Sequence, residues 1–250
     1  MRGFIPSLFA VSALASPVSL TSRAAKGIYF LLAGDSTTAP NGGWGDAFLS
    51  TTVASGSSGH NYGHGGATTA SFRSGGDWAK VTNDIGTYKS TYDVYVTIQF
   101  GHNDQKANSG VTVEQFKANL LKFAQETTSA GGAPILLTPL TRRNFASSTS
   151  NVTENLVEQR SATIDVATNN NIKWIDLNLV SMNYVNTIKK DAASKYNLAA
   201  NDWTHLNTWG GVVFSRIVSD LLVEKYGNIF TPATKANSTL SALIKAGKPA

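Results

Sequence analysis

The sequence predicts an α/β fold, a three-layer α/β/α sandwich around a central parallel sheet of about five strands. Two observations predict it. Short apolar segments of strand length alternate with longer segments whose apolar residues recur every three or four positions. Such alternation produces a parallel sheet covered by helices on both faces. No repeat or linker divides the 250 residues, so about five strands favour a single flavodoxin-like domain over an eightfold barrel.

Five segments have the length and the apolar or β-branched composition of strands. The clearest is residues 93–100, Asp-Val-Tyr-Val-Thr-Ile-Gln-Phe. The segment 55–66 is rich in Gly and Ser and is typical of a short strand that runs into a tight loop. In chain order, the expected strands are residues 28–34, a short strand within 55–66, and residues 93–100, 133–139 and 172–177.

Between these strands the apolar residues have the spacing of one helix face. Asp77 is a candidate N-cap for the segment that follows it, and Gly131-Gly132 is expected to end the helix before the fourth strand. In chain order, the expected helices are residues 44–49, 77–89, 112–129, 152–168, 181–196 and 209–226.

Both ends of the chain are expected to lie outside the folded domain. Arg2 precedes a mostly apolar segment, residues 4–15, that ends in small residues, which is the form of a secretory signal peptide. It is shorter than the roughly 20 apolar residues that span a bilayer. We therefore expect a signal peptide over residues 1–15, ending at the latest near residue 25, and a secreted, extracellular protein. A single domain over residues 26–230 and a loosely attached tail over residues 231–250 are expected to follow.

Charge and composition exclude several classes of function. The chain has no cysteine, which excludes disulfides and thiol chemistry. Its formal net charge is +5, but Lys and Arg are scattered, so no basic stripe for nucleic acid is present. An anionic polysaccharide is a better candidate than nucleic acid for a charged partner. A solvated surface that binds neither is the favoured interpretation. Two sequons, at Asn151 and Asn237, would accept N-glycans in a eukaryotic host. We expect a monomer that binds neither nucleic acid nor a membrane.

Several familiar site motifs are missing from the sequence. No serine has glycine two residues before and two residues after it, as the nucleophile elbow requires. There is no Walker A sequence, and no dinucleotide glycine pattern follows a strand. The four histidines lack the spacing of a zinc site, and no cysteine could help them. We therefore expect no metal and no cofactor.

A set of polar residues and one glycine follow the expected strands or precede the last helix. Ser36 stands two residues after the first strand, Gly66 follows the second and Asn103 follows the third, while Asp202 and His205 lie before the last helix. The carboxyl ends of parallel strands meet at one rim, so these residues can converge. Each also has an ordinary explanation, as a turn residue, a flexible loop, a surface histidine or a helix cap.

Together these residues supply the parts of a serine hydrolase. A serine hydroxyl needs a base to take its proton, and His205 is the histidine best placed for that role. Asp202, three residues earlier, could hold the other ring nitrogen. The backbone N–H groups of Ser36 and Gly66 and the side-chain amide of Asn103 are candidate donors for an oxyanion hole.

The four blocks that carry these residues resemble those of the SGNH, or GDSL, hydrolases. In chain order they are Gly34-Asp35-Ser36, Gly66 within Asn61-Tyr62-Gly63-His64-Gly65-Gly66, Gly101-His102-Asn103-Asp104 and Asp202-Trp203-Thr204-His205. The resemblance implies a flavodoxin-like SGNH hydrolase fold. It also implies an acyl-serine mechanism without a metal, with Ser36, Gly66, Asn103 and His205 as the four residues of the family name.

Within that superfamily, the chain resembles the rhamnogalacturonan acetylesterase branch. Gly43-Trp44-Gly45 and the segment Thr138-Pro139-Leu140-Thr141-Arg142-Arg143-Asn144-Phe145 carry this likeness. It implies acetyl esters of plant polysaccharides, most specifically acetylated pectin, as substrates. His102, Arg142 and Arg143 are then candidate substrate contacts, the arginines by binding a galacturonate carboxylate. A solvated pair of loop arginines is the alternative.

Three other functions remain open. A general or lipolytic esterase, or an acetylxylan esterase, would use the same catalytic residues. A non-catalytic carbohydrate-binding protein could use aromatic residues as sugar platforms, namely Trp44, Trp78, Trp203 and Trp209.

Overall fold

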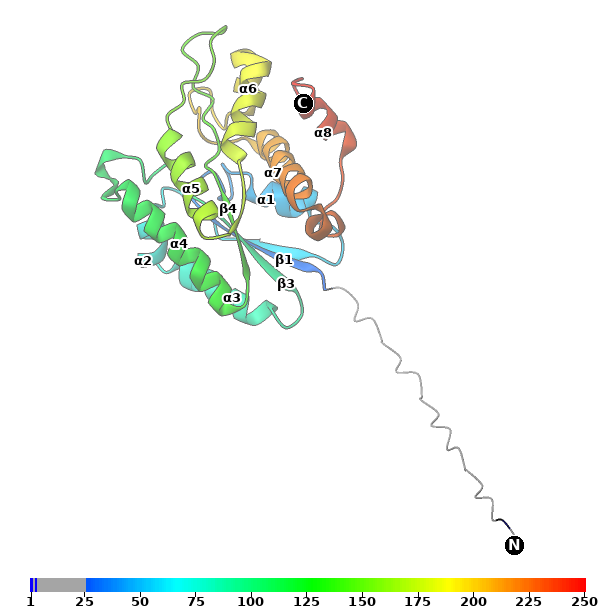
Figure 1. Ribbon diagram of the computed structural model, residues 1–250. Helices are drawn as coiled ribbons and strands as arrows, with labels where there is room; N and C mark the ends of the chain where they lie inside the picture. Colours follow the sequence, from blue (N-terminus) through cyan, green and yellow to red (C-terminus); the bar gives the residue numbers. More distant parts are fainter. Residues whose placement is uncertain (2, 4–25) are drawn as a thin grey trace.

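A five-stranded parallel sheet forms the centre of the computed structural model, which describes residues 1, 3 and 26–250. The expected signal peptide lies outside the described residues, apart from residues 1 and 3. The strand order is β2-β1-β3-β4-β5 with every neighbouring pair parallel (Figure 1), which confirms the predicted fold class. The strands are β1 (Ile28–Gly34), β2 (Ser58–Asn61), β3 (Asp93–Gln99), β4 (Ala133–Leu137) and β5 (Lys173–Ile175).

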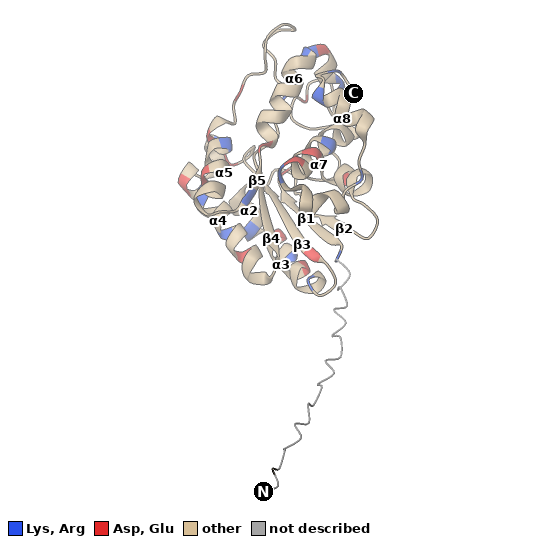
Figure 2. Ribbon diagram, turned by 45° about the vertical axis from the view of Figure 1, so that its right-hand side comes forward, with Lys and Arg blue, Asp and Glu red and all other residues tan. Residues whose placement is uncertain are grey.

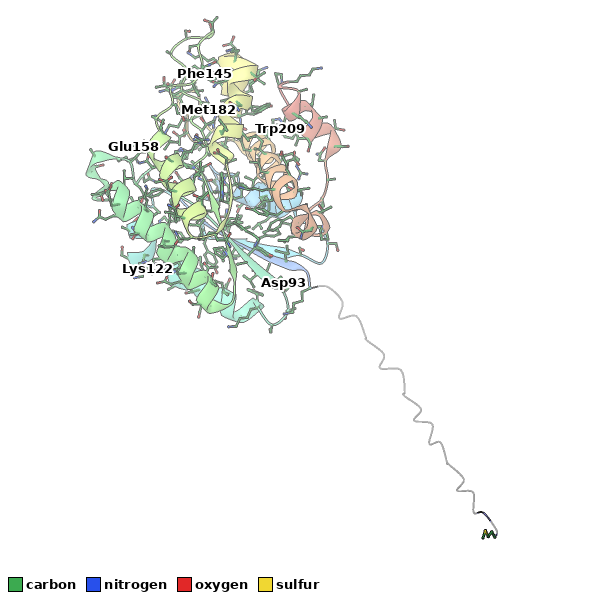
Figure 3. All side chains as sticks on the ribbon, in the orientation of Figure 1. Asp93, Lys122, Phe145, Glu158, Met182 and Trp209 are labelled. Atoms are coloured by element: carbon green, nitrogen blue, oxygen red, sulfur yellow. The ribbon has the colours of Figure 1, made fainter. Side chains whose placement is uncertain are left out.

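Helices cover both faces of the sheet, so all seven residues of β1 are buried. Phe30 and Leu32 point into one layer and Leu31 and Ala33 into the other, because side chains alternate along a strand. Side chains fill the space between the sheet and both helical layers (Figure 3). One layer contains α2 (Thr69–Ser74), α3 (Asp77–Tyr88), α4 (Val113–Ala130) and α5 (Val157–Asn169); the other contains α1 (Gly45–Ala47), α6 (Leu177–Ala193), α7 (Thr208–Phe230) and α8 (Ser238–Lys245).

Three helix starts differ from the sequence-based expectation. The helix expected over residues 152–168 begins only at Val157, because Val152 instead forms an antiparallel bridge with Phe145. The helix expected from residue 181 begins at Leu177, because the Asp176 carboxylate caps it by accepting the Leu179 N–H at 3.2 Å. Asp77 is the first residue of α3 rather than its cap.

The C-terminal segment is docked on the domain and is not the loosely attached tail that the sequence suggested. Within it, α8 buries Leu240 against the layer that contains α6 and α7. Asn237 caps α8 by accepting the Leu240 N–H at 3.1 Å. At its end, the Ala250 N–H donates to the hydroxyl of Tyr196 at 3.0 Å. The short apolar pattern of α8 was too brief to stand out in the sequence.

Charged side chains of both signs are spread over the helices, and no basic stripe is visible on the face shown in Figure 2. Within residues 26–250, no helix combines the length and the apolar character needed to cross a membrane.

Candidate active site

Ser36 lies in a tight turn at the carboxyl end of β1, the strand between β2 and β3. The Asp35 carboxylate builds this turn by accepting the Thr37 N–H at 2.9 Å and the Thr37 hydroxyl at 2.8 Å. The Asp35 carbonyl accepts the Thr38 N–H at 3.0 Å. Gly34 is required before the turn because a Cβ there would overlap the Thr38 side chain and the Gln99 carbonyl. The turn therefore holds the Ser36 hydroxyl at the carboxyl end of the strands.

Ser36, His205 and Asp202 form one hydrogen-bonded chain. The Ser36 Oγ lies 2.9 Å from His205 Nε2, and His205 Nδ1 lies 2.8 Å from Asp202 Oδ2. This arrangement is competent to remove the serine proton, with the carboxylate fixing the tautomer that leaves Nε2 free to accept. The structure thus brings together the three residues that the sequence indicated as nucleophile, base and orienting acid.

Asp202 is held as a carboxylate by the residues of its own turn. Burial alone would raise the pKa of Asp202, but hydrogen bonds from His205 and Thr204 keep it below its ordinary value. The backbone N–H groups of Thr204 and His205 donate to Oδ1 at 3.0 and 2.8 Å. Asp202 does not cap the helix that follows. Asn207 does so, by accepting the Gly210 N–H at 2.8 Å.

The expected oxyanion donors have the contacts and the freedom that the role needs. The Asn103 side-chain amide donates to the Ala67 carbonyl at 2.9 Å, which leaves its second N–H for a ligand and puts it beside the Gly66 peptide. Gly66 has a φ of +79°, a left-handed conformation that favours glycine. Among the described residues, the backbone N–H groups of Ser36 and Gly66 have no acceptor. These donors are available to a negatively charged oxygen.

An open cavity begins at Gly66. Its volume is about 350 Å³, and it is lined by residues 64–67 with Ser71, Ser74, Gly75 and Asp77. The Asp77 carboxylate contacts His64 Nδ1 at 2.5 Å and Lys80 Nζ at 2.9 Å. The cavity therefore offers hydroxyl and charged groups next to a candidate oxyanion donor.

His102 is not a substrate contact, contrary to the sequence-based expectation. Its side chain is 3% exposed, and its Nδ1 lies 3.4 Å from the fully buried Asp35 Oδ2. Burial alone would raise the pKa of Asp35, but His102 and the two Thr37 donors hold it below its ordinary value. Through its contact with Asp35, the buried His102 thus links the turn that carries Ser36 to the loop that carries Asn103.

Arg143 is not a substrate contact either, nor a solvated loop residue. Its side chain is fully buried, and its guanidinium binds the His205 carbonyl and the Asn197 side chain. The sequence places two arginines side by side but does not say that the second points inward.

Arg142 is half-buried, and its guanidinium is occupied by protein acceptors. Nε donates to Thr204 Oγ1 at 3.2 Å, Nη1 to Asn155 Oδ1 at 2.9 Å and Nη2 to the His102 carbonyl at 3.4 Å. The Gln105 side-chain oxygen accepts from both Nη1 and Nη2 when its amide is oriented toward them. We assign Arg142 to holding three loops together rather than to binding a substrate carboxylate.

Two supporting residues were not singled out in the sequence. Gln99, the last residue of β3, accepts the Trp44 indole N–H at 2.6 Å and donates to the Thr37 hydroxyl at 2.5 Å. Lys106 donates to Asn103 Oδ1 at 2.7 Å and thereby turns the amide nitrogen away from itself. A glutamine at the end of an otherwise apolar strand was the available signal for Gln99. Lys106 had none beyond its spacing of three from Asn103.

Comparison with known proteins agrees with this geometry. Residues 32–211, more than half of the chain, match the model of the GDSL-like Lipase/Acylhydrolase family. The chain is also 35% identical over 127 residues to the rhamnogalacturonan acetylesterase RhgT of Bacillus subtilis (strain 168). That match covers 48% of this chain and about half, 52%, of the relative.

Solved structures share the fold at low sequence identity. The protein YXIM_BACsu of Bacillus subtilis superposes with a TM-score of 0.67 at 20% identity, covering 80% of this chain and 57% of that one. A catalytic mutant of Axe2, an acetylxylan esterase of Geobacillus stearothermophilus, gives a TM-score of 0.55 at 18% identity, covering 80% and 94%. The family model matches residues 32–211, which include the Ser36, Asn103 and His205 blocks. The chain therefore belongs to the GDSL-like lipase/acylhydrolase family.

Proposed function

We propose that this protein is a serine carboxylic-ester hydrolase that removes acetyl groups from a plant cell-wall polysaccharide, with acetylated rhamnogalacturonan as the favoured substrate. The observation that carries the proposal is the hydrogen-bonded chain from Ser36 through His205 to Asp202. A carbohydrate-binding protein without catalysis has no use for that alignment.

The first half of the reaction transfers the acetyl group to the enzyme. Ser36 Oγ attacks the acetyl carbonyl carbon while His205 Nε2 takes the hydroxyl proton. The bond between that carbon and the sugar oxygen then breaks, and the imidazolium gives its proton to the leaving sugar oxygen. The products of this half are a free sugar hydroxyl and an acetyl ester on Ser36.

The second half releases acetate. A water molecule gives a proton to His205 Nε2 and attacks the acetyl carbonyl on Ser36. The bond to Ser36 Oγ breaks, the serine regains its proton from the imidazolium, and acetate leaves. In both halves the carbonyl oxygen becomes negative. The N–H groups of Ser36 and Gly66 and the free N–H of the Asn103 amide are positioned to stabilise it.

The similarity to RhgT supports a pectic substrate, and the fold shared with Axe2 makes acetylated xylan the second candidate. We also propose that the protein is secreted and acts outside the cell as a monomer, which the apolar N-terminal segment 4–15 and the polymeric substrate support.

Acetate release from a panel of acetylated rhamnogalacturonan, homogalacturonan, xylan and mannan tests the proposal. We expect rhamnogalacturonan to give the highest kcat/KM, and the Ser36→Ala variant to release no acetate above background while keeping the wild-type melting temperature. If acetylated xylan is turned over faster, xylan replaces rhamnogalacturonan as the proposed substrate. If Ser36→Ala still releases acetate, Ser36 is not the nucleophile.

A series of p-nitrophenyl esters separates the proposal from a lipolytic esterase. An acetylesterase is expected to turn over the acetate fastest and to lose kcat/KM as the acyl chain lengthens. An optimum at eight or more carbons would instead indicate an acyl-chain site.

A further inference from the structure

Arg143 places a fully buried cation behind the loop that carries Asp202 and His205. Its Nη2 donates to the His205 carbonyl at 2.6 Å, and its Nε donates to Asn197 Oδ1 at 2.6 Å. Its backbone N–H donates to the Trp203 carbonyl at 2.7 Å. One residue therefore contacts the base itself, the residue two before it, and the point where the loop begins.

The loop needs such a tether because little else fixes it. Residues 197–206 contain no regular helix or strand and are closed at their base by a single antiparallel bridge between Asn197 and Leu206. The His205 carbonyl also accepts the Leu198 N–H at 3.0 Å, and the Leu206 N–H donates to the Gly42 carbonyl at 2.8 Å. Arg143 is the fully buried cation that contacts this loop, beside the half-buried Arg142, which contacts it at Thr204.

Burying the charge of Arg143 at this position costs free energy of folding. Burial lowers the pKa of Arg143 to about 10, against the opposing attraction of Asp202, so it remains a cation at neutral pH. Among the described residues, its Nη1 has no hydrogen-bond partner. A buried charge with an unpaired donor is rarely the most stable choice, and an apolar side chain of similar volume is often at least as stable. Stability alone does not explain it.

We propose that Arg143 is a positioning residue for the catalytic base, fixing the His205 backbone by its hydrogen bond so that the ring stays aligned between Ser36 and Asp202. The inference rests on the proposed esterase function. The guanidinium holds the His205 carbonyl and the Asn197 side chain at the same time. Because a small displacement of a catalytic group can cost much of the rate, this hold preserves the contact between His205 Nε2 and Ser36 Oγ.

Few other charges face this cation. Asp202 and His205 lie on the loop itself, and on the far side the Arg143 guanidinium lies 5.8 Å from the centre of the Phe214 ring of α7. Lys190 of α6 lies over the Trp203 ring at 5.7 Å, at the outer side of the same loop. Arg142 is held by Thr204. Exchange of Arg143 therefore removes the one fully buried charge in this group.

Two variants test this role. Arg143→Met removes both hydrogen bonds of the guanidinium, and Arg143→Lys keeps the charge but loses the planar fork that reaches two acceptors at once. We measure kcat and KM for p-nitrophenyl acetate. For Arg143→Met we expect a fall of about 10- to 100-fold in kcat and a KM changed less than about threefold. Arg143→Lys should lose less kcat, because its ammonium can still replace one of the two hydrogen bonds.

Arg216 provides a matched control. It is buried at 3% exposure, donates to the Lys235 carbonyl at 2.7 Å and pairs with Asp220 at 3.0 Å in α7, with no contact to the catalytic loop. Arg216→Met should lower the melting temperature while leaving kcat and KM of the folded enzyme within about twofold of wild type.

The outcomes are separable. If Arg143→Met keeps the wild-type kcat, or if Arg216→Met lowers kcat equally, the proposal is overturned. Should Arg143→Met fail to fold, Arg143→Lys and Asn197→Ala decide, because Asn197→Ala removes the acceptor of Nε and should lower kcat with little change in KM; an unchanged kcat in both would overturn the proposal. Lack of activity in the wild-type enzyme would overturn the proposed function instead, so the two failures are distinguishable.

Discussion

The nucleophile and its base are held by different kinds of structure. Ser36 stands on a turn at the end of the buried strand β1, within a network of Asp35, Thr37 and Gln99 that is almost closed to solvent. His205 stands on an irregular loop, and its side chain is 33% exposed. The sheet positions Ser36 through backbone register, whereas individual side chains position His205. Changes on the His205 side should therefore damage catalysis with less damage to the fold.

The largest effect among the residues that orient the site is expected for Asp202→Asn. The amide would favour the wrong imidazole tautomer, so kcat should fall about 10⁴-fold while the fold survives. The pKa of Asp202 is depressed, so its stabilising contribution is complete above its unfolded pKa and is lost as the pH falls through its folded value. Thermal melts from pH 3 to 7 should thus show the wild type and Asp202→Asn converging in stability toward the acid end. A constant difference would contradict this.

A smaller effect on kcat is expected for Asn103→Ala, which removes one of the candidate oxyanion donors. Loss of one oxyanion donor typically lowers kcat by about 10²- to 10³-fold. KM should change little, since the amide acts on the charge that develops during the reaction. Steady-state kinetics with p-nitrophenyl acetate measures both constants, and a loss confined to KM would indicate a substrate-binding role instead.

Gln99→Leu tests the strand side of the comparison. It removes the links to the Trp44 indole and the Thr37 hydroxyl without touching the reacting atoms. We expect about 1–3 kcal/mol of lost stability, from a buried indole N–H left without its partner, and a fall in kcat of about tenfold or less. Urea unfolding and kinetics on the same preparation measure the two. Full stability with a large loss of kcat would reverse the proposed division between the two regions.

The smallest effect on catalysis is expected for Leu240→Ala in α8. Truncation of this buried side chain should cost about 2 kcal/mol of unfolding free energy. Activity at 25 °C should remain within about twofold of wild type, because α8 touches neither the Ser36 turn nor the His205 loop. Denaturant unfolding followed by tryptophan fluorescence measures the loss; no loss would indicate a helix that docks without contributing to stability.

The sheet and the catalytic residues were predictable from sequence because both follow from local pattern. Apolar segments such as residues 28–34 mark buried parallel strands, and a polar residue just beyond a strand end, such as Ser36, lies by topology at the ligand-binding edge. The fold class, the expected strands and the convergence of Ser36, Asp202 and His205 agree with the structure.

The direction of long polar side chains was not predictable in the same way. His102 and Arg143 lie in loops, where no periodicity tells the inward side from the outward one, and both proved to be buried. Their partners, Asp35 and the His205 carbonyl, are 67 and 62 residues away along the chain. The early start of α6 was not predicted either, because it depends on a single capping side chain, that of Asp176.

The hydrogen bond between Ser36 and His205 joins positions 169 residues apart in the sequence. A contact of such long range requires that the sheet and the last long helix have come together. A chain still emerging from the ribosome contains the nucleophile but has no base beside it. Hydrolytic activity is thus withheld until folding is complete, and recovery of turnover during refolding reports the final step of assembly rather than the first.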